Sequence, residues 1–582
     1  MRLINCQTLE IEEFNEESLP AFAILSHTWG NDEVSFEIMK ASGGTGGHLR
    51  DGNGYKKIKE TCRMAKMEGL SHAWVDTCCI DKSSSAELTE SINSMFHWYA
   101  KSAVCYVFLV DLPTNVEFGV GIGSCKWISR GWTLQETIAP RNLVFYDQQW
   151  RCRGNKFELS AHLSAVTGIP VSVLRRDRNI WQYSVAQRMS WAAKRQTTRV
   201  EDTAYCLLGI FEVNMPLVYG EGTMAFCRLQ EEIIKRNNDL TMFAWNPKPQ
   251  LQPNNGHHCS VLAASPAAFS DSADVMRWEI SQHNPEFAIT NKGLRIDDYL
   301  HLISMDGDRQ KPGRGGYFLA IGAYYDAQGR SRHIGVPLWK AGPDLYLRQL
   351  RPLVQIDTSH SLTGISTTAT SIFYIMASMR VPGNRTLVGF RKDAVHLVVP
   401  GNIWRKTPEI HWDYTDRLFY RLNTTDTVRV VEAEIFLTPG PGPGGGGGAA
   451  KKNPTLFVIL LDQRDKNRCG GYIFAESRFP SEVADLFQRR NVNRLMRWGD
   501  FWTKYPALKP PAITSSVRLT VDGVVYTVTI EANVEQREMF RESVSVEMMH
   551  VKVQVGGREN MKVEGERERE RGERHLAIRA AD

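Results

Sequence analysis

The sequence has no long apolar run and no large excess of one charge. Its apolar stretches, such as residues 456–461, are far shorter than the roughly 18 residues of a membrane-spanning helix, so no spanning helix is expected. Of its 582 residues, 70 are basic and 65 acidic, and 42% are apolar. This balance favours a globular protein and indicates neither a nucleic-acid partner nor a disordered chain.

The sequence also lacks the cysteine pattern of a disulfide framework. It has 11 cysteines, an odd number at irregular spacings, and acidic residues stand near the N-terminus where a secretion signal would be apolar. A reduced, cytoplasmic protein is therefore expected. Cys78-Cys79 and His257-His258-Cys259 do not have the ligand spacing of a zinc site, so no metal is predicted.

Three nucleotide and hydrolase fingerprints are missing. There is no G-x-x-x-x-G-K-[ST] loop, and neither glycine-rich segment, at 42–50 or 119–125, has a complete G-x-G-x-x-G between a strand and a helix. No G-x-S-x-G elbow occurs either. These absences argue against a P-loop NTPase, a dinucleotide-binding dehydrogenase and an α/β-hydrolase.

What is present is an alternation of apolar runs and helical patterns. The runs at 21–25, 72–80, 103–110 and 143–146 read as strands. Amphipathic patterns separate the first three runs, and this order predicts a parallel sheet in an α/β domain over residues 1–160.

The rest of the chain divides into regions that differ in composition and in predicted secondary structure. Residues 161–245 predict a helical extension, and residues 260–555 predict a β-rich C-terminal domain with a hairpin turn at Asp522-Gly523. Within the latter, 439–453 is a Gly/Pro-rich loop, and 556–582 is a charged tail.

Polar side chains follow the first three apolar runs. Ser26, His27 and Trp29 come after the first run, Asp76 follows the apolar start of the second, and Asp111 follows the third. Ligands of open parallel sheets bind at the carboxyl ends of the strands, so these residues are candidates for one site. The alternative for each aspartate is that it caps a turn.

The segment RGWTLQE (130–136) places Arg130, Trp132 and Glu136 in a helix too short to be stable by itself. Glu136 could carry chemistry. It could equally cap its helix, or pair with Arg130 or Arg141 to fasten the helix to the sheet.

Several blocks of the first 245 residues resemble a known family. LSHTWG (25–30), WVDTCCIDKSSSAELTESINSMFHWY (74–99), RGWTLQE (130–136) and MPLVYGEGTMAFCRLQEEII (215–234) are similar to the heterokaryon incompatibility (HET) domain of filamentous fungi. The family acts in non-self recognition, a form of innate immunity that ends in programmed cell death. It is thought to be related to Toll/interleukin-1 receptor (TIR) domains, so the resemblance implies a TIR-like (flavodoxin-like) parallel sheet.

The same resemblance implies two rival functions. Some TIR domains cleave NAD through one glutamate that follows a tryptophan, and here Trp127 and Trp132 both precede Glu136. In this interpretation the protein is an NAD glycohydrolase that uses NAD as a substrate and needs no cofactor. The predicted residues are catalytic Glu136 and substrate-binding Ser26, His27, Trp29, Asp76, Arg130 and Trp132.

The alternative is a non-enzymatic module. It would recruit death-signalling partners through homotypic contacts or contacts with other incompatibility proteins. An inactive or decoy member is a third possibility.

Overall fold

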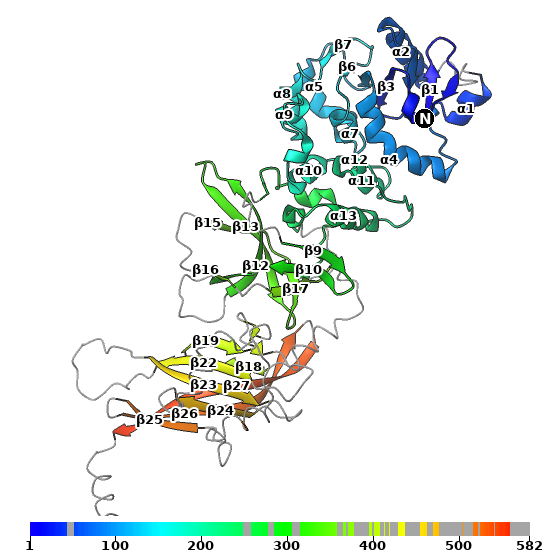
Figure 1. Cartoon of the computed structure of the whole chain (residues 1–582). Coiled ribbons are helices and arrows are strands. Elements are labelled where there is room, and N and C mark those ends of the chain that lie inside the picture. The colour runs from blue at the N-terminus through cyan, green and yellow to red at the C-terminus, as the bar shows by residue number, and fades with distance from the viewer. Residues whose placement is uncertain are drawn as a thin grey trace, which may run out of the picture.

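The computed structural model describes residues 1–43 and 52–247, then 258–277, 285–298, 300–304 and 315–357, and beyond these a series of short segments that ends at residue 558. Figure 1 shows an N-terminal α/β and helical region followed by β-rich sheets. The loop predicted at 439–453 lies outside the described residues, as does the predicted tail apart from the end of the last strand.

A seven-stranded sheet lies at the centre of the N-terminal region, in the order β2-β1-β4-β3-β5-β6-β7. The strands are β1 (Arg2–Asn5), β2 (Ile11–Glu13), β3 (Phe22–His27), β4 (His72–Trp74), β5 (Val104–Phe108), β6 (Leu143–Tyr146) and β7 (Cys152–Asn155). The central strands β4, β3, β5 and β6 pair parallel. The predicted α/β domain with parallel pairing is therefore confirmed.

The order of the parallel strands positions the site. Numbered along the chain they run 2-1-3-4, which matches the start of the flavodoxin-like order, and antiparallel β7 follows β6 at the edge. The direction of winding reverses at β3, so the carboxyl ends of β3 and β5 flank the point where open α/β sheets bind ligands.

The prediction of one strand over 72–80 is wrong. β4 ends at Trp74, and α3 (Asp76–Cys79) follows, so the adjacent cysteines lie on a helical turn. The Val75 N–H donates to the Cys79 thiol sulfur at 3.4 Å, and the Cys78 thiol donates to the Val75 carbonyl at 3.8 Å. These local bonds replace the ladder of a longer strand.

Two long helices connect the first three parallel strands. They are α2 (Asn53–Met67), which connects β3 to β4, and α4 (Ser85–Lys101), which connects β4 to β5 across β3. Because these two connections run in opposite directions along the sheet, right-handed crossovers place the helices on opposite faces (Figure 1). At the start of α4 the Ser84 hydroxyl accepts from the Glu87 N–H. The Glu87 carboxylate accepts from the Asp81 N–H and pairs with Arg2, so only half of the capping box forms.

Shorter helices complete the N-terminal region. They are α1 (Phe36–Ala41), α5 (Phe118–Gly121), α6 (Lys126–Ser129), α7 (Thr133–Ile138), α8 (Ser160–Thr167), α9 (Val171–Leu174), α10 (Val185–Ala192), α11 (Asp202–Tyr205), α12 (Leu208–Phe211) and α13 (Met224–Arg236). The last six form the helical stretch expected after residue 160. Gly209 on α12 lies against Phe96 of α4 so closely that a Cβ there would sit 2.1 Å from the Phe96 Cβ.

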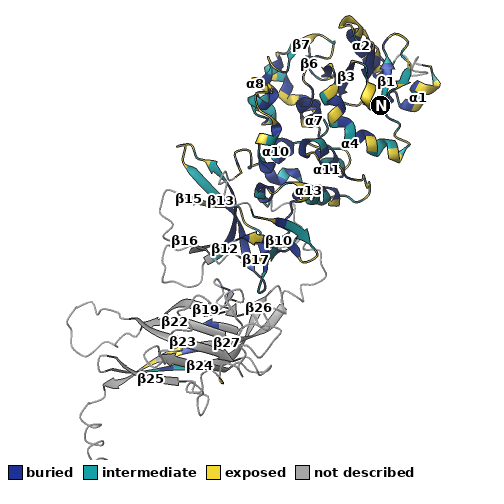
Figure 2. Cartoon of the chain, viewed as in Figure 1, coloured by how far each residue is buried: buried dark blue, intermediate teal, exposed yellow. Residues whose placement is uncertain are grey.

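The β-rich part contains three further sheets, of ten, six and four strands in the described segments. The ten-stranded sheet contains β8 (His258–Cys259), β9 (Phe287–Thr290), β10 (Gly293–Asp298), β11 (His301–Ser304), β12 (Gly315–Tyr325), β13 (Ser331–Lys340), β14 (Leu345–Gln349), β15 (Val354–Asp357), β16 (Ile365–Thr367) and β17 (Ser371–Ile375). Its core is continuous with that of the helices (Figure 2). Buried Arg348 of β14 joins the two, because its guanidinium donates to the Phe243 and Trp245 carbonyls.

The remaining sheets are built from strands nearer the C-terminus. They are β18 (Val395–Val398), β19 (Gly401–Thr407), β20 (Trp412–Asp413), β21 (Leu418–Phe419), β22 (Arg429–Phe436), β23 (Pro454–Asp462), β24 (Gly470–Ala475), β25 (Ser516–Val521), β26 (Val524–Met539) and β27 (Glu542–Arg558). β25 and β26 pair antiparallel with Val521 opposite Val524, as the predicted hairpin requires.

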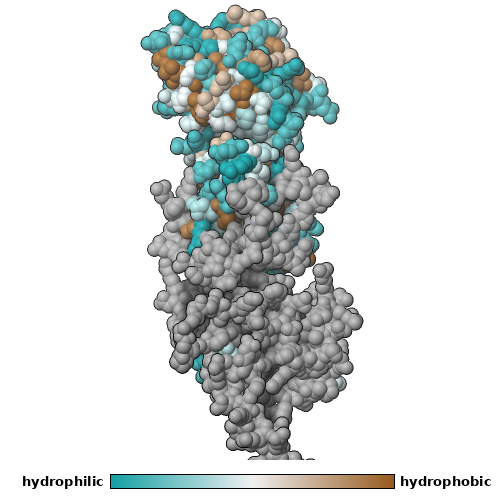
Figure 3. Space-filling model, turned by 90° about the vertical axis from the view of Figure 1, so that its left-hand side faces the viewer, coloured by the Kyte–Doolittle hydropathy of each residue, from teal (hydrophilic) through white to brown (hydrophobic). Residues whose placement is uncertain are grey.

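The surface of the N-terminal region is mixed. On the face drawn in Figure 3, hydrophobic residues lie scattered among hydrophilic ones. Large exposed hydrophobic side chains come from separate elements and include Val120, Phe157, Val200 and Met224. None of the helices that the structure describes is both long and apolar enough to cross a bilayer.

Candidate functional site

The short helix α7, which contains most of RGWTLQE, is buried along its whole length. The chain enters it through Gly131, where a Cβ would lie 2.5 Å from the Thr197 methyl carbon and 3.2 Å from the Cys206 sulfur. Only glycine allows so close an approach without a shift of these neighbours. The helix is therefore held by its surroundings, which compensates for a length too short to be stable in isolation.

Side chains from distant parts of the chain hold both ends of α7. At its start, Arg195 donates to the Arg130 carbonyl at 3.0 Å and to the Thr133 hydroxyl at 2.8 Å. At its end, the buried Lys156 ammonium donates to the carbonyls of Thr137 (3.1 Å) and Pro140. Burial lowers the pKa of Lys156 to about 8.

Glu136 on α7 faces the end of β3. The Ser26 hydroxyl donates to its carboxylate, and the Trp127 indole N–H donates to the Ser26 oxygen at 2.7 Å. Ser26 and Trp127 are fully buried, and Glu136 is 7% exposed. These three residues, from β3, α6 and α7, are called the buried cluster below.

The burial of Glu136 has an electrostatic consequence. Burial raises its pKa to about 7, the negative charge of Asp76 adds to the rise, and the Ser26 hydrogen bond and the charges of Arg130 and Arg195 oppose it. The carboxyl is therefore divided between its protonated and ionised forms near neutral pH. A cation that came close would shift it towards the carboxylate.

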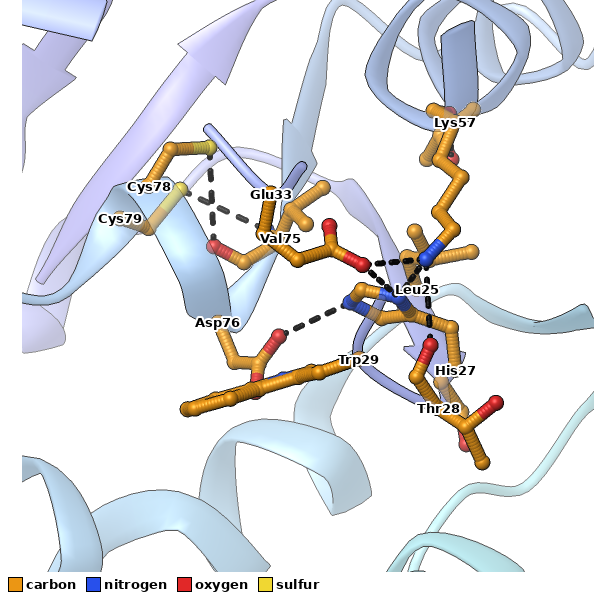
Figure 4. Close-up of polar contacts among 12 residues, drawn as sticks. Leu25, His27, Thr28, Trp29, Glu33, Lys57, Val75, Asp76, Cys78 and Cys79 are labelled. Atoms are coloured by element: carbon orange, nitrogen blue, oxygen red, sulfur yellow. Dashed lines mark hydrogen bonds and ion pairs between the residues drawn. The ribbon is translucent and has the colours of Figure 1, made fainter. Parts of the chain in front are cut away.

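A second group of side chains lies beside the buried cluster at the same sheet edge. The Asp76 carboxylate, on the first residue of α3, accepts from the Trp29 indole N–H at 2.8 Å and lies 3.1 Å from the His27 Nε2 atom (Figure 4). Burial would raise the pKa of Asp76, but the His27 hydrogen bond and the positive charges of Lys82 and Arg130 hold it well below its usual range. Asp76 is thus an ionised carboxylate.

Lys57 of α2 determines how His27 is oriented. Its ammonium lies 3.0 Å from the His27 Nδ1 atom, donates to the Thr28 carbonyl at 3.1 Å and pairs with Glu33 (Figure 4). Because an ammonium can only donate, Nδ1 acts as the acceptor, and Nε2 carries the proton that His27 donates to Asp76.

Trp29 is exposed, with 45% of its surface accessible. The Lys82 nitrogen lies 3.7 Å from the centre of its ring, and the Arg130 guanidinium carbon lies 5.3 Å from it. His27, Trp29, Asp76, Lys82 and Arg130 are called the edge cluster below. It combines one carboxylate, an indole and two cations.

Six of the seven predicted site residues lie in these two adjoining clusters, whereas Trp132 does not. The Trp132 indole instead interacts with the Asp202 carboxyl, in the helical extension. Asp111 accepts from the Lys126 N–H at 2.9 Å and so caps α6. This is the structural role that the sequence analysis gave as the alternative to ligand binding. Whether any of these residues binds or cleaves a substrate stays a prediction.

Sequence reasoning missed three residues of the site. Glu33 and Lys82 lie in loops without a distinctive pattern. Lys57 did have a signal, since it stands among the apolar positions of α2 and is itself buried. Among the residues that the structure describes, no group of three or more His, Cys, Asp or Glu side chains is arranged to hold a metal ion.

The comparison with family models finds a match in the N-terminal region. Residues 22–120 match the family model of the heterokaryon incompatibility protein (HET). The chain contains a HET domain. The matched residues include β3, β4 and β5, and therefore Ser26, His27, Trp29 and Asp76 of the two clusters.

Two further findings extend the comparison beyond the HET domain. Residues 224–301 match a domain of unknown function, DUF8212. The chain is also 46% identical over 316 residues to the vegetative incompatibility protein HET-E-1 of Podospora anserina, a match that covers 52% of this chain and 21% of that protein. The chain thus spans about a fifth of the curated relative's length, and no solved structure matches it.

Proposed function

We propose that this protein is an effector of heterokaryon incompatibility whose HET domain cleaves NAD when it is assembled, and that NAD loss leads to cell death. The HET domain and the name of the similar vegetative incompatibility protein support the biological role. Other incompatibility proteins, or further copies of this chain, would be the partners that bring about assembly.

The observation that carries the chemical part is the placement of Glu136. It is a buried carboxyl with a pKa raised to about 7, at the carboxyl end of a parallel sheet and beside a second, ionised carboxylate. Two carboxyl groups whose pKa values are pushed apart are typical of sites that stabilise a developing positive charge.

The reaction needs little acid catalysis. The bond between the ribose C1′ and the nicotinamide nitrogen breaks, and its electron pair goes to the nicotinamide ring, which loses its positive charge. The cationic C1′ is then captured by water, whose proton passes to a carboxylate or to solvent, so the products are nicotinamide, ADP-ribose and a proton. Glu136 would stabilise the cationic sugar, and the positive charge would favour its ionised form.

The test is nicotinamide release by the full chain, assayed at high concentration and clustered on a resin. We expect Glu136→Gln to reduce release by roughly a hundredfold or more, since it removes the charge and keeps the size. Glu201→Gln is the matched control, because Glu201 is also a buried glutamate but accepts from the Gly220 and Gly222 N–H groups away from the site. Equal turnover by Glu136→Gln and the parent would reject the assignment.

One observation favours the non-enzymatic alternative. The hydrogen bonds of the buried cluster also fasten α7 to β3, so Glu136 has a structural use without any substrate. In that case NAD would be untouched, and substitutions on exposed helix faces would abolish the incompatibility reaction in fungal cells. Glu136→Gln would leave the reaction intact.

A further inference from the structure

The cations around the site fall into two kinds. Lys57 and Arg195 make hydrogen bonds within the fold: Lys57 pairs with Glu33, and Arg195 donates to the Arg130 carbonyl and the Thr133 hydroxyl, although its Nη2 atom is buried without a hydrogen-bond partner among the described residues. These contacts tie both side chains to the backbone or to a carboxylate of the fold.

Lys82 and Arg130 are different. Within the part of the chain that the structure describes, neither side chain has a hydrogen bond or a carboxylate at ion-pair distance. The charges of Lys82 and Arg130 both lower the pKa of Asp76, a nearby carboxylate. Asp76 already accepts from Trp29 and lies in contact with His27. Both cations lie close to the Trp29 ring, so their like charges repel; burial lowers the pKa of Lys82, and the charge of Arg130 adds to the lowering.

A fold has no need to hold two unpaired cations over one exposed ring. Contacts between a cation and an exposed ring are weaker than charge-assisted hydrogen bonds to an anion. A dianionic group within reach of both Lys82 and Arg130 would relieve their repulsion and satisfy both. The planar guanidinium of Arg130 matches two phosphate oxygens, and the Lys82 ammonium adds a point charge.

We propose that Lys82 and Arg130 form a phosphate-binding pair that selects a pyrophosphate-bearing nucleotide over the corresponding nucleoside. This deepens the proposed function, since it concerns the substrate of the same site, and it adds Lys82 as a specificity-determining residue. Binding of the phosphates would draw both cations off the Trp29 ring and free that ring for a base.

The experiment measures equilibrium binding of ADP-ribose, inorganic pyrophosphate and adenosine to the full chain by calorimetry. We expect ADP-ribose and pyrophosphate to bind and adenosine to bind far more weakly. Lys82→Met and Arg130→Met should each weaken ADP-ribose binding by roughly tenfold or more, and added salt should weaken it in the parent.

The matched control is Lys292→Met. The Lys292 ammonium also lies over an aromatic ring, 4.1 Å from the centre of Tyr374, but it is neutralised by Asp344 and belongs to the β-rich part. Its removal should leave ADP-ribose binding unchanged. Thermal unfolding of each variant would show that the two site variants remain folded, as expected for side chains that are not fully buried.

Two results would overturn the inference. One is an affinity for ADP-ribose that Lys82→Met and Arg130→Met leave unchanged, and the other is adenosine bound as tightly as ADP-ribose. Binding as expected without nicotinamide release would support the phosphate-binding pair and reject NAD cleavage, so the two proposals fail separately.

Discussion

The buried cluster and the edge cluster lie side by side at the same sheet edge but differ in how their charges are satisfied. In the buried cluster, Ser26 and Trp127 form a chain of hydrogen bonds that ends on Glu136, and burial raises the pKa of that carboxyl. In the edge cluster, Asp76 is surrounded by donors and cations and stays ionised. Two carboxyl groups of similar intrinsic acidity thus acquire different charges from their surroundings alone.

The difference separates what the fold needs from what a ligand could use. The buried cluster holds α7 in place at the cost of burying a carboxyl group. The edge cluster has surplus positive charge and an exposed indole, which the fold does not require. Variants that make the same chemical change in both clusters can therefore test whether the two really differ.

The largest expected effect concerns the pH dependence of Glu136. Its pKa is about 7 in the folded protein and 4.5 as an ordinary glutamate, so the unfolded chain ionises first as the pH rises. The parent should therefore lose stability between about pH 4.5 and 7, and Glu136→Gln should be more stable than the parent by about 3 kcal/mol at pH 8 but not at pH 4. Denaturant unfolding across this range measures it.

Glu201→Gln should show the opposite sign. Backbone N–H groups of Glu201 itself, Gly220 and Gly222 lower the pKa of Glu201, so its contribution to stability is present above the unfolded pKa and is lost in acid. The parent should be the more stable of this pair at pH 8. A pH-independent difference between Glu136→Gln and the parent would contradict the origin assigned to the raised pKa.

A middle-sized effect should come from replacing an indole with a phenyl ring in each cluster. Trp127→Phe removes the buried donor to Ser26 and leaves a void, so we expect a loss of about 2 kcal/mol in the free energy of unfolding. Trp29→Phe removes a donor to Asp76 at a site open to water and should cost less than about 1 kcal/mol. Equal losses would mean that the clusters do not differ in burial as described.

A smaller effect than that of Trp127→Phe is expected for Asp76→Asn. The carboxylate offsets the charges of Lys82 and Arg130, and its side chain is 21% exposed, so we expect a loss of about 1 kcal/mol at neutral pH that shrinks as salt is added. Because its folded pKa is depressed, this contribution is present above the unfolded pKa and vanishes as the pH falls through the folded pKa. Denaturant unfolding at low and high salt checks the first point, and unfolding at neutral and acid pH checks the second.

The sequence predicted the parallel core well because buried parallel strands have continuous apolar runs, as in residues 21–25 and 103–110. It failed at the edges. β1 and β2 are short and mixed in polarity, and Asp76 begins a helical turn inside an apolar run that resembled one strand. A segment of three or four residues is too short for the spacing of its apolar residues to distinguish a strand from a helical turn.

The sequence by itself determined which residues stand at the ends of the strands, and it identified Ser26, Asp76 and Glu136 as candidate site residues. Only the tertiary structure decided that Ser26 donates to a carboxylate 110 residues away, that Lys57 orients His27, and that Trp132 points to the helical extension. Hydrogen-bond partners and pKa values depend on burial and on side chains from distant elements. No local pattern records these, so the charge of each carboxyl group becomes defined only when the chain has folded.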